Sequence, residues 1–187
     1  LASIRDGGQL DNTLVVFTSD HGDYLGDHGP VYKWLMTDQA IRVPFIVRLP
    51  DGARGRAARS GVVDERLFSQ IDVGPTVLEA AGLPVPQRLD GHSNLGRFVS
   101  GDPAQAPEAV LCEDNYLTMY RTLDRKYIHY AGQPHAEYFD LKTDPFEEHN
   151  LADDPAHAGE LAELRARMLD ELLVSRYLGS LPQIGRS

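Results

Sequence analysis

The residues best suited to chemistry follow a short apolar run. Residues 13–18 read Thr-Leu-Val-Val-Phe-Thr, a pattern typical of a buried strand. Asp20 and His21 come directly after it, and Lys33 follows in the same loop. An adjacent carboxylate and imidazole suit a divalent cation such as calcium, magnesium or manganese, of which manganese tolerates nitrogen best. Lys33 offers a positive charge to an anionic leaving group.

The position of this loop also favours a site. In open α/β sheets, ligands bind beyond the carboxyl ends of the strands, so we expect Asp20 and His21 to face a crevice. Two protein ligands leave coordination positions open, as a catalytic metal requires. A simpler interpretation stays open, because an Asp-His pair after a strand also fits a helix cap followed by a solvated loop.

A longer pattern narrows these alternatives. Ser-Asp-His-Gly-Asp-Tyr-Leu-Gly-Asp-His-Gly is followed by Lys33, and three further motifs come in order, at 42–47 (Arg-Val-Pro-Phe-Ile-Val), 72–78 (Asp-Val-Gly-Pro-Thr-Val-Leu) and 138–151. This series, from residue 13 to about 155, resembles the sulfatases and the related phosphonate monoester and choline-sulfate hydrolases of the alkaline-phosphatase superfamily.

The resemblance implies a role for each residue of the loop. Asp20 and His21 would be metal ligands, with calcium the first expectation and manganese or magnesium the alternatives. Lys33 would be the catalytic residue that contacts the sulfate or phosphonate group. The expected loop supports are Gly22, Asp27 and His28, because metal ligands need surrounding groups to orient them.

The resemblance also implies a nucleophile that this chain lacks. Enzymes of this kind oxidise a Cys or Ser in a short Cys/Ser-x-Pro/Ala/Ser-x-Arg motif to formylglycine. Cys112, the single cysteine, is followed by Glu-Asp-Asn-Tyr and does not match, so we expect it to be structural. Leu1 to Ile4 read as the end of a helix already under way. We therefore expect the N-terminal half of the protein, with the nucleophile, to be missing.

Composition limits the partners. The chain has 187 residues and a net charge of −10, which argues against a nucleic-acid partner. No apolar run approaches the roughly 20 residues that span a bilayer, and the N-terminus lacks the features of a signal peptide. We expect a soluble protein that binds a small anionic ester; cytoplasm and periplasm both stay open, as does the oligomeric state.

The expected fold class is α/β. Residues 1–105 would be the C-terminal part of an alkaline-phosphatase-like α/β sandwich, with strands at 12–18 and 43–49, a short strand at Val62-Val63, a helix from about 72 to 81, and a connector over 83–107. Residues 106–187 would form a subdomain with strands at 109–112, 117–122, 126–130 and 137–141. These predict a four-stranded antiparallel sheet, packed by a C-terminal helix at 158–177. The alternation in 126–130 predicts one covered and one wet sheet face.

The leading hypothesis is metal-dependent hydrolysis of sulfate esters by the complete protein. Hydrolysis of phosphonate monoesters or phosphodiesters on the same scaffold is the alternative within the superfamily. A non-catalytic interaction module that kept the fold is a third possibility. The presence or absence of the formylglycine motif upstream of Leu1 separates the last reading from the first two.

Overall fold

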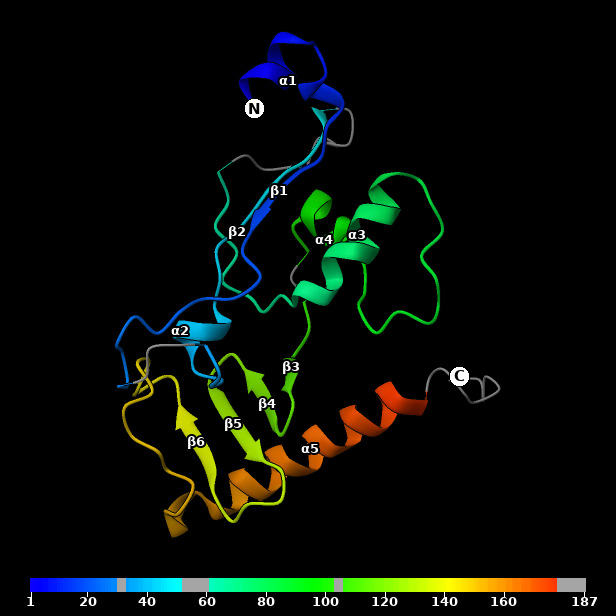
Figure 1. Ribbon diagram of the computed structural model, residues 1–187. Coiled ribbons are helices and arrows are strands. Elements are labelled where there is room, and N and C mark those ends of the chain that lie inside the picture. Colours follow the sequence, from blue (N-terminus) through cyan, green and yellow to red (C-terminus); the bar gives the residue numbers. More distant parts are fainter. Residues whose placement is uncertain (30–32, 52–60, 103–105, 178–187) are drawn as a thin grey trace. The chain divides into compact units, whose positions relative to one another are not determined.

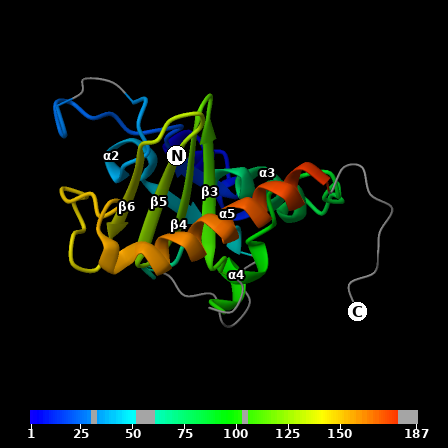
Figure 2. The same ribbon diagram turned by 90° about the horizontal axis from the view of Figure 1, so that it is seen from below.

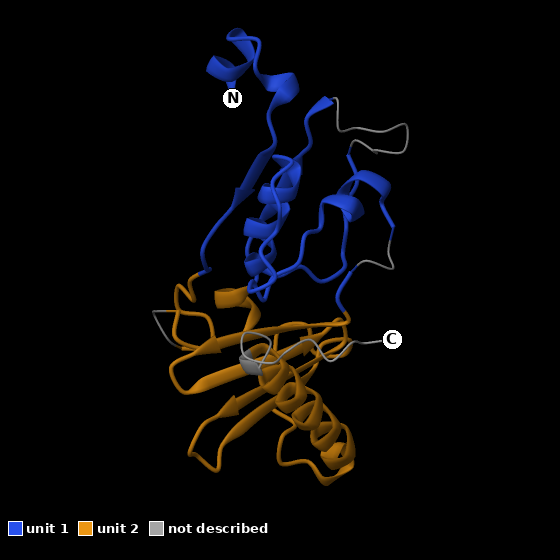
Figure 3. Cartoon of the chain, turned by 90° about the vertical axis from the view of Figure 1, so that its right-hand side faces the viewer, with its two compact units in different colours: residues 1–22, 42–107 blue, residues 23–41, 108–187 orange. Residues whose placement is uncertain are grey.

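The computed structural model describes residues 1–29, 33–51, 61–102 and 106–177. The chain divides into two compact units, each described here by itself (Figure 3). Unit 1 comprises Leu1–Gly22 and Arg42–Pro107, and unit 2 comprises Asp23–Ile41 and Glu108–Ser187. Compact units need not fold independently, so the domain boundary expected near residue 105 stays a prediction. A cluster of basic residues in the sequence, Arg54, Arg56 and Arg59, lies outside the described residues.

Unit 1 contains a two-stranded sheet and short helices (Figure 1). The elements in chain order are α1 Ala2–Asp6, η1 Leu10–Asn12, β1 Val15–Thr18, β2 Phe45–Arg48, η3 Gln70–Asp72, α3 Val73–Ala80 and α4 Leu95–Ser100. Strands β1 and β2 are antiparallel, with Val15 opposite Arg48 and Thr18 opposite Phe45. Both strands were expected from their β-branched residues, and both are shorter than expected because real strand ends fray.

Three sequence-based expectations for unit 1 were wrong. Strand β1 is not buried, because nothing among the described residues covers Phe17, which is 59% exposed. Val62 and Val63 form no strand. The connector at 83–107 contains helix α4, because the buried side chain of Arg97 fixes that segment by donating hydrogen bonds to Asp64 and to the Leu67 carbonyl.

Unit 2 is built on a meander of four antiparallel strands in the order β3-β4-β5-β6 (Figure 1). The strands are β3 Ala109–Asp114, β4 Leu117–Thr122, β5 Arg125–Tyr130 and β6 Ala136–Asp140. Helix α2 Asp38–Ile41 precedes them in the chain, and η5 Pro155–His157 and α5 Ala158–Tyr177 follow. This sheet and its C-terminal helix confirm the fold expected for the second half of the chain.

Both faces of the four-stranded sheet are covered, so the expectation of one wet face was wrong. Helix α5 lies across one face (Figure 2), where Leu164 and Met168 pack on Tyr120, Tyr127 and Tyr138. The opposite face is covered by described residues of the segment 23–41, among them Met36 and Ile41. Met36 of this segment packs in a second cluster, whose other buried members are Leu117, Met119, Ile128, Tyr130 and Phe139. A segment that is distant in the sequence supplies this cover, which a local alternation pattern cannot reveal.

Candidate active site

One group of candidate residues lies directly after β1, in residues 19–22 of unit 1. Asp20 Oδ2 and His21 Nε2 lie 3.3 Å apart, and the Asp20 side chain is 83% exposed. The other oxygen, Oδ1, accepts a hydrogen bond from the His21 amide at 3.0 Å, and Ser19 Oγ donates to the His21 carbonyl at 2.8 Å. Gln70 from η3 donates to the Ser19 carbonyl. Residues 20–22 begin no helix, so Asp20 is not a helix cap.

The donor set of this pair fits a divalent cation. His21 Nδ1 donates to the Gly22 carbonyl at 2.6 Å, which leaves Nε2 of a neutral ring as an acceptor facing the Asp20 carboxylate. Two acceptors in that arrangement attract a proton or a cation between them. Atoms bound about 2.1–2.5 Å from one ion lie roughly 3–3.5 Å apart when they subtend a right angle. The observed 3.3 Å separation agrees with that geometry.

A second group of candidate residues lies in the loop that carries Lys33, in unit 2. Lys33 is exposed. His28 has a positive φ of 55°, its ring lies edge-on to Tyr24, and its Nε2 accepts a hydrogen bond from Gln39 of α2 at 3.1 Å. The Asp27 amide donates to the Tyr24 carbonyl at 2.8 Å. Asp27 and His28 thus take part in the turn structure of this loop.

The candidate residues therefore fall into two groups. Asp20, His21 and Gly22 are brought together in unit 1, while Asp27, His28 and Lys33 belong to unit 2. The roles assigned to them from the sequence remain predictions.

Sequence analysis missed a buried ion cluster beside this loop. Lys126 Nζ lies 2.6 Å from Asp38 Oδ1 and also contacts Glu147 Oε1. The side chains of Lys126 and Glu147 are both 0% exposed. Burial raises the pKa of Glu147, and the Lys126 ammonium opposes that rise. The sequence holds a signal for this cluster. Lys126 alternates with Ile128 and Tyr130 and so lies on the same core-facing side of the strand, where a buried charge requires a partner of opposite charge.

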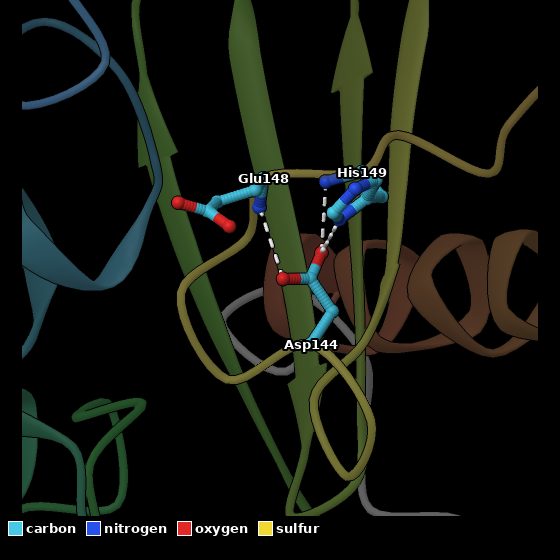
Figure 4. A group of neighbouring side chains, drawn as sticks. All are labelled: Asp144, Glu148 and His149. Atoms are coloured by element: carbon cyan, nitrogen blue, oxygen red, sulfur yellow. Dashed lines mark hydrogen bonds and ion pairs between the residues drawn. The ribbon is translucent and has the colours of Figure 1, made fainter.

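The turn that carries Glu147 is closed by Asp144. The Asp144 carboxylate accepts the amides of Glu148 at 3.1 Å and of His149 at 2.8 Å (Figure 4). His149 Nδ1 lies 3.7 Å from the same carboxylate. Burial acts to raise the pKa of Asp144, but the two amide hydrogen bonds outweigh it and lower that pKa. This group is a loop closure that holds the backbone on both sides of Glu147.

A polar network in unit 1 shapes the turn at 90–94. Asp72 precedes α3 but makes no side-chain cap: its buried carboxylate accepts hydrogen bonds from the His92 amide at 2.8 Å and from Asn94 Nδ2 at 3.0 Å. Gly91 packs so closely that a Cβ there would overlap the Ile71 carbonyl. The His92 side chain itself is exposed.

Comparison with protein families gives one match that covers most of the chain. Residues 26–173 match the family described as N-sulphoglucosamine sulphohydrolase, C-terminal. The matched range includes Lys33 and Glu147 and begins after His21.

Two curated relatives extend the similarity toward the N-terminus. The chain is 33% identical to the multifunctional alkaline phosphatase superfamily protein PehA of Trinickia caryophylli, over 90% of this chain and 36% of the relative. It is 32% identical to the N-acetylglucosamine-6-O-sulfatase of Bacteroides thetaiotaomicron, over 88% of this chain and 30% of the relative. The chain thus spans about a third of the length of these relatives.

Solved structures match over nearly the whole chain as well. BT4656, in complex with its substrate D-glucosamine-2-N,6-O-disulfate, matches with a TM-score of 0.84 and 29% identity, over 94% of this chain and 37% of that one. The phosphonate monoester hydrolase of Agrobacterium radiobacter matches with a TM-score of 0.78 and 30% identity, over 93% of this chain and 38% of that one.

Proposed function

Because the chain belongs to the sulfatase family, in its N-sulphoglucosamine sulphohydrolase C-terminal region, we propose that it serves in a metal-dependent hydrolase of sulfate esters. The observation that carries this proposal at the site is the pairing of Asp20 Oδ2 with His21 Nε2 at 3.3 Å, with the other ring nitrogen engaged by Gly22. That arrangement presents one hard oxygen and one imidazole nitrogen outward from the end of a strand.

Asp20 and His21 would hold a divalent cation, with calcium as the first choice and manganese or magnesium as alternatives. Such an ion, when bound, supplies positive charge that offsets charge on the ester oxygens. The Gly22 carbonyl fixes the tautomer of His21, and the His21 amide orients the Asp20 carboxylate. Both contacts come from the backbone of residues next to the pair, which gives each side chain a local orienting group.

Lys33 would contact the reacting group. Its ammonium is a compact charge on a long flexible side chain, suited to stabilising the oxygen that leaves with the alcohol. The net charge of −10 repels anions in general, so attraction of an anionic ester must come from local positive charge.

The substrate we propose is a sulfate ester of a sugar or an aryl alcohol. One matched enzyme is named an N-acetylglucosamine-6-O-sulfatase, and another was solved with a glucosamine disulfate as its substrate. The similarity to a phosphonate monoester hydrolase favours phosphonate and phosphodiester hydrolysis as the second candidate. Side-by-side turnover of an aryl sulfate and a phenyl phosphonate monoester by the full-length protein separates the two. Turnover of neither ester would favour a non-catalytic module.

We also place the nucleophile outside these residues. The thiol of Cys112 is partly buried in β3, burial raises its pKa, and its sequence context lacks the formylglycine motif. Phe17 and Ile46, which pair across β1 and β2, are 59% and 61% exposed, so this sheet has an uncovered apolar face. The chain spans about a third of its relatives, and the remainder of such a protein would cover that face and supply the nucleophile.

Direct metal binding tests the site. Calorimetric titration of the full-length protein with calcium and with manganese should give a binding isotherm that is abolished or strongly weakened in an Asp20→Ala, His21→Ala variant. Asp23→Ala is a matched control, because that exposed carboxylate in the same sequence stretch accepts only the local Leu25 amide in the described hydrogen bonds. Equal affinity in the double variant and the wild type would overturn the assignment.

A further inference from the structure

The segment that carries Lys33 is part of the core of unit 2. Described residues of the segment 23–41 cover one face of the four-stranded sheet, where Met36 is 4% exposed among Met119, Ile128 and Phe139. Residues 25–29 and Lys33 to Trp34 are exposed, whereas Tyr24 and Met36 at the two ends of this loop are buried. The position of Lys33 then depends on how firmly the two ends of this loop are held.

The two ends are joined to each other by a buried pair. The hydroxyls of Tyr24 and Thr37 lie 2.5 Å apart, and the Thr37 amide also donates to the Tyr24 hydroxyl at 3.3 Å. Tyr24 is 0% exposed and Thr37 is 4% exposed. Residues 25–36, with Lys33 among them, therefore form a loop that is closed at its base.

The base of the loop is in turn fixed to the sheet by the ion cluster. The Asp38 amide, next after Thr37, donates to Glu147 Oε2 at 2.6 Å, and the Asp38 carboxylate pairs with Lys126 of β5. Arg121 of β4 lies 3.3 Å from the second Asp38 oxygen. Asp38 is thus held at its backbone and at both carboxylate oxygens.

The contacts of Glu147 indicate a dedicated anchor. Its side chain is fully buried, and its φ of 59° lies in a region that non-glycine residues adopt only when the surroundings enforce it. The turn from Asp144 to His149 holds that backbone in place (Figure 4). Removing one member of a buried ion cluster leaves an uncompensated charge, so the cluster resists local opening.

We infer that Glu147, Lys126 and Asp38 are positioning residues for Lys33: the C-terminal sheet sets the position of the loop that presents this ammonium to the ester. The catalytic part of this inference rests on the proposed role of Lys33, and the anchoring part rests on the contacts alone. The second half of the chain then contributes to catalysis through the loop as well as to stability.

The test is hydrogen exchange and kinetics on the full-length protein. Glu147→Ala should raise the exchange rate of amides in residues 23–41 by about tenfold or more and lower kcat on an aryl sulfate at least tenfold, with a smaller change in KM. Glu147→Gln keeps an acceptor for the Asp38 amide, so its amide exchange rates and its kcat should lie between those of the wild type and of Glu147→Ala. It also serves if the alanine variant fails to fold.

Asp140→Ala is the matched control. Asp140, at the end of β6, pairs at 2.6 Å with Arg125 of β5, the residue before Lys126. This variant therefore also removes the acidic partner of a β5 cation. Its contacts are to β5 and to nearby turn backbone, away from the Lys33 loop. It should leave the amide exchange rates of residues 23–41 and kcat within about twofold of the wild type.

A double variant tests whether Glu147 acts through Lys33. In a Lys33→Ala background, Glu147→Ala should lower kcat by less than a further twofold, because an ammonium that is absent cannot be misplaced.

Unchanged exchange over residues 23–41 in both Glu147 variants would overturn the inference, as would a full, additive loss of kcat in the Lys33→Ala background. A failure of the proposed function is distinguishable, because it would appear as wild-type turnover in Lys33→Ala itself, whatever the exchange rates show.

Discussion

At Asp20 and His21 the chemistry follows from side chains that are neighbours in the sequence. The side-chain atoms that face away from each other, Asp20 Oδ1 and His21 Nδ1, are hydrogen-bonded by the His21 amide and the Gly22 carbonyl, so the orientation of the pair depends on local backbone. Lys33 differs, because its surroundings depend on Thr37, Asp38 and Glu147. Only contacts of the first kind, between neighbours in the sequence, can be predicted from a short stretch of sequence.

Replacement of Lys33 separates chemistry from folding. Lys33 is exposed on a loop, so Lys33→Ala should change the free energy of unfolding by less than about 1 kcal/mol. Loss of a charge at the developing anion should lower turnover of an aryl sulfate by about a hundredfold or more. Thermal unfolding and steady-state kinetics of the full-length variant measure the two quantities. Normal turnover with normal stability would refute the catalytic role.

The residues that sequence analysis missed share a physical reason. Lys126 and Asp38 are 88 positions apart, and Asp38 and Glu147 are 109 positions apart, yet they form one cluster. Motif spacing predicts ligands that share a loop, whereas long-range ion pairs depend on how distant segments pack. Asp144-Pro145 is typical of a turn, and nothing in this local pattern marks Glu147 as a partner of Lys126.

Among the elements, those with strong local patterns were predicted well. Strand β4 and helix α5 have the bounds that alternation and leucine spacing predict, Leu117–Thr122 and Ala158–Tyr177. Helix α4 was missed because Pro, Gly and Ser dominate its surroundings, and it is held by tertiary contacts of Asn94 and Arg97. In such a segment packing outweighs local propensity.

The turn between α3 and α4 should be sensitive to one methyl group. Gly91→Ala would push a Cβ into the Ile71 carbonyl and displace the backbone that presents the His92 amide to Asp72. We expect a loss of about 1–3 kcal/mol in the free energy of unfolding.

Gly74→Ala is the control for that substitution. A Cβ at Gly74, in helix α3, meets nothing within 4 Å beyond its chain neighbours, so any cost there comes only from the neighbouring Pro75 ring and should stay below that of Gly91→Ala. Denaturant unfolding of both variants makes the comparison. Equal stability of the two would show that the Gly91 backbone moves aside at no cost.

Asp64 should make unit 1 sensitive to acid. Hydrogen bonds from Arg66, with further help from the buried Arg97, hold the pKa of the Asp64 carboxyl well below its usual range. A carboxyl with a lowered folded-state pKa stabilises the fold above its unfolded pKa of about 3.9, and this contribution is lost as the pH falls toward the folded value.

The corresponding measurement is a series of thermal melts of the wild type and Asp64→Asn between pH 7 and pH 2. The variant should melt at a lower temperature than the wild type at pH 7, and this difference in melting temperature should narrow steadily below about pH 5. A difference in melting temperature that stays constant down to pH 2 would show that the Asp64 charge contributes nothing to the stability of the fold.

For the molecule as a whole, the comparisons establish the family. The first motif is divided between the two units, with Asp20 and His21 in unit 1 and Lys33 in unit 2. Among the described helices, none combines the length and apolar character needed to cross a membrane. The sequence motifs predicted the family because several stand in the same order along the chain. They could not predict that residues 23–41 pack on the C-terminal sheet, since that contact joins distant parts of the sequence.

The 187-residue chain alone should show no esterase turnover. Cys112 lacks the context for formylglycine formation, and the Ser19 hydroxyl makes its shorter hydrogen bond, 2.8 Å, to the His21 carbonyl, with a longer contact of 3.4 Å to Asp20 Oδ1. The purified chain would be assayed with aryl sulfate and phosphonate monoester substrates in calcium and in manganese. Turnover that disappears in Ser19→Ala would show that the nucleophile has been misplaced.

The most direct test of metal-dependent hydrolysis at Asp20 and His21 is a metal titration of turnover. The full-length protein is treated with a chelator, and aryl sulfate hydrolysis is followed as calcium is added back. We predict that activity is lost on chelation and returns in a saturable manner in the wild type, but not in the Asp20→Ala, His21→Ala variant at the same calcium concentrations. Turnover that survives chelation, or an identical calcium response in the double variant, would contradict the account.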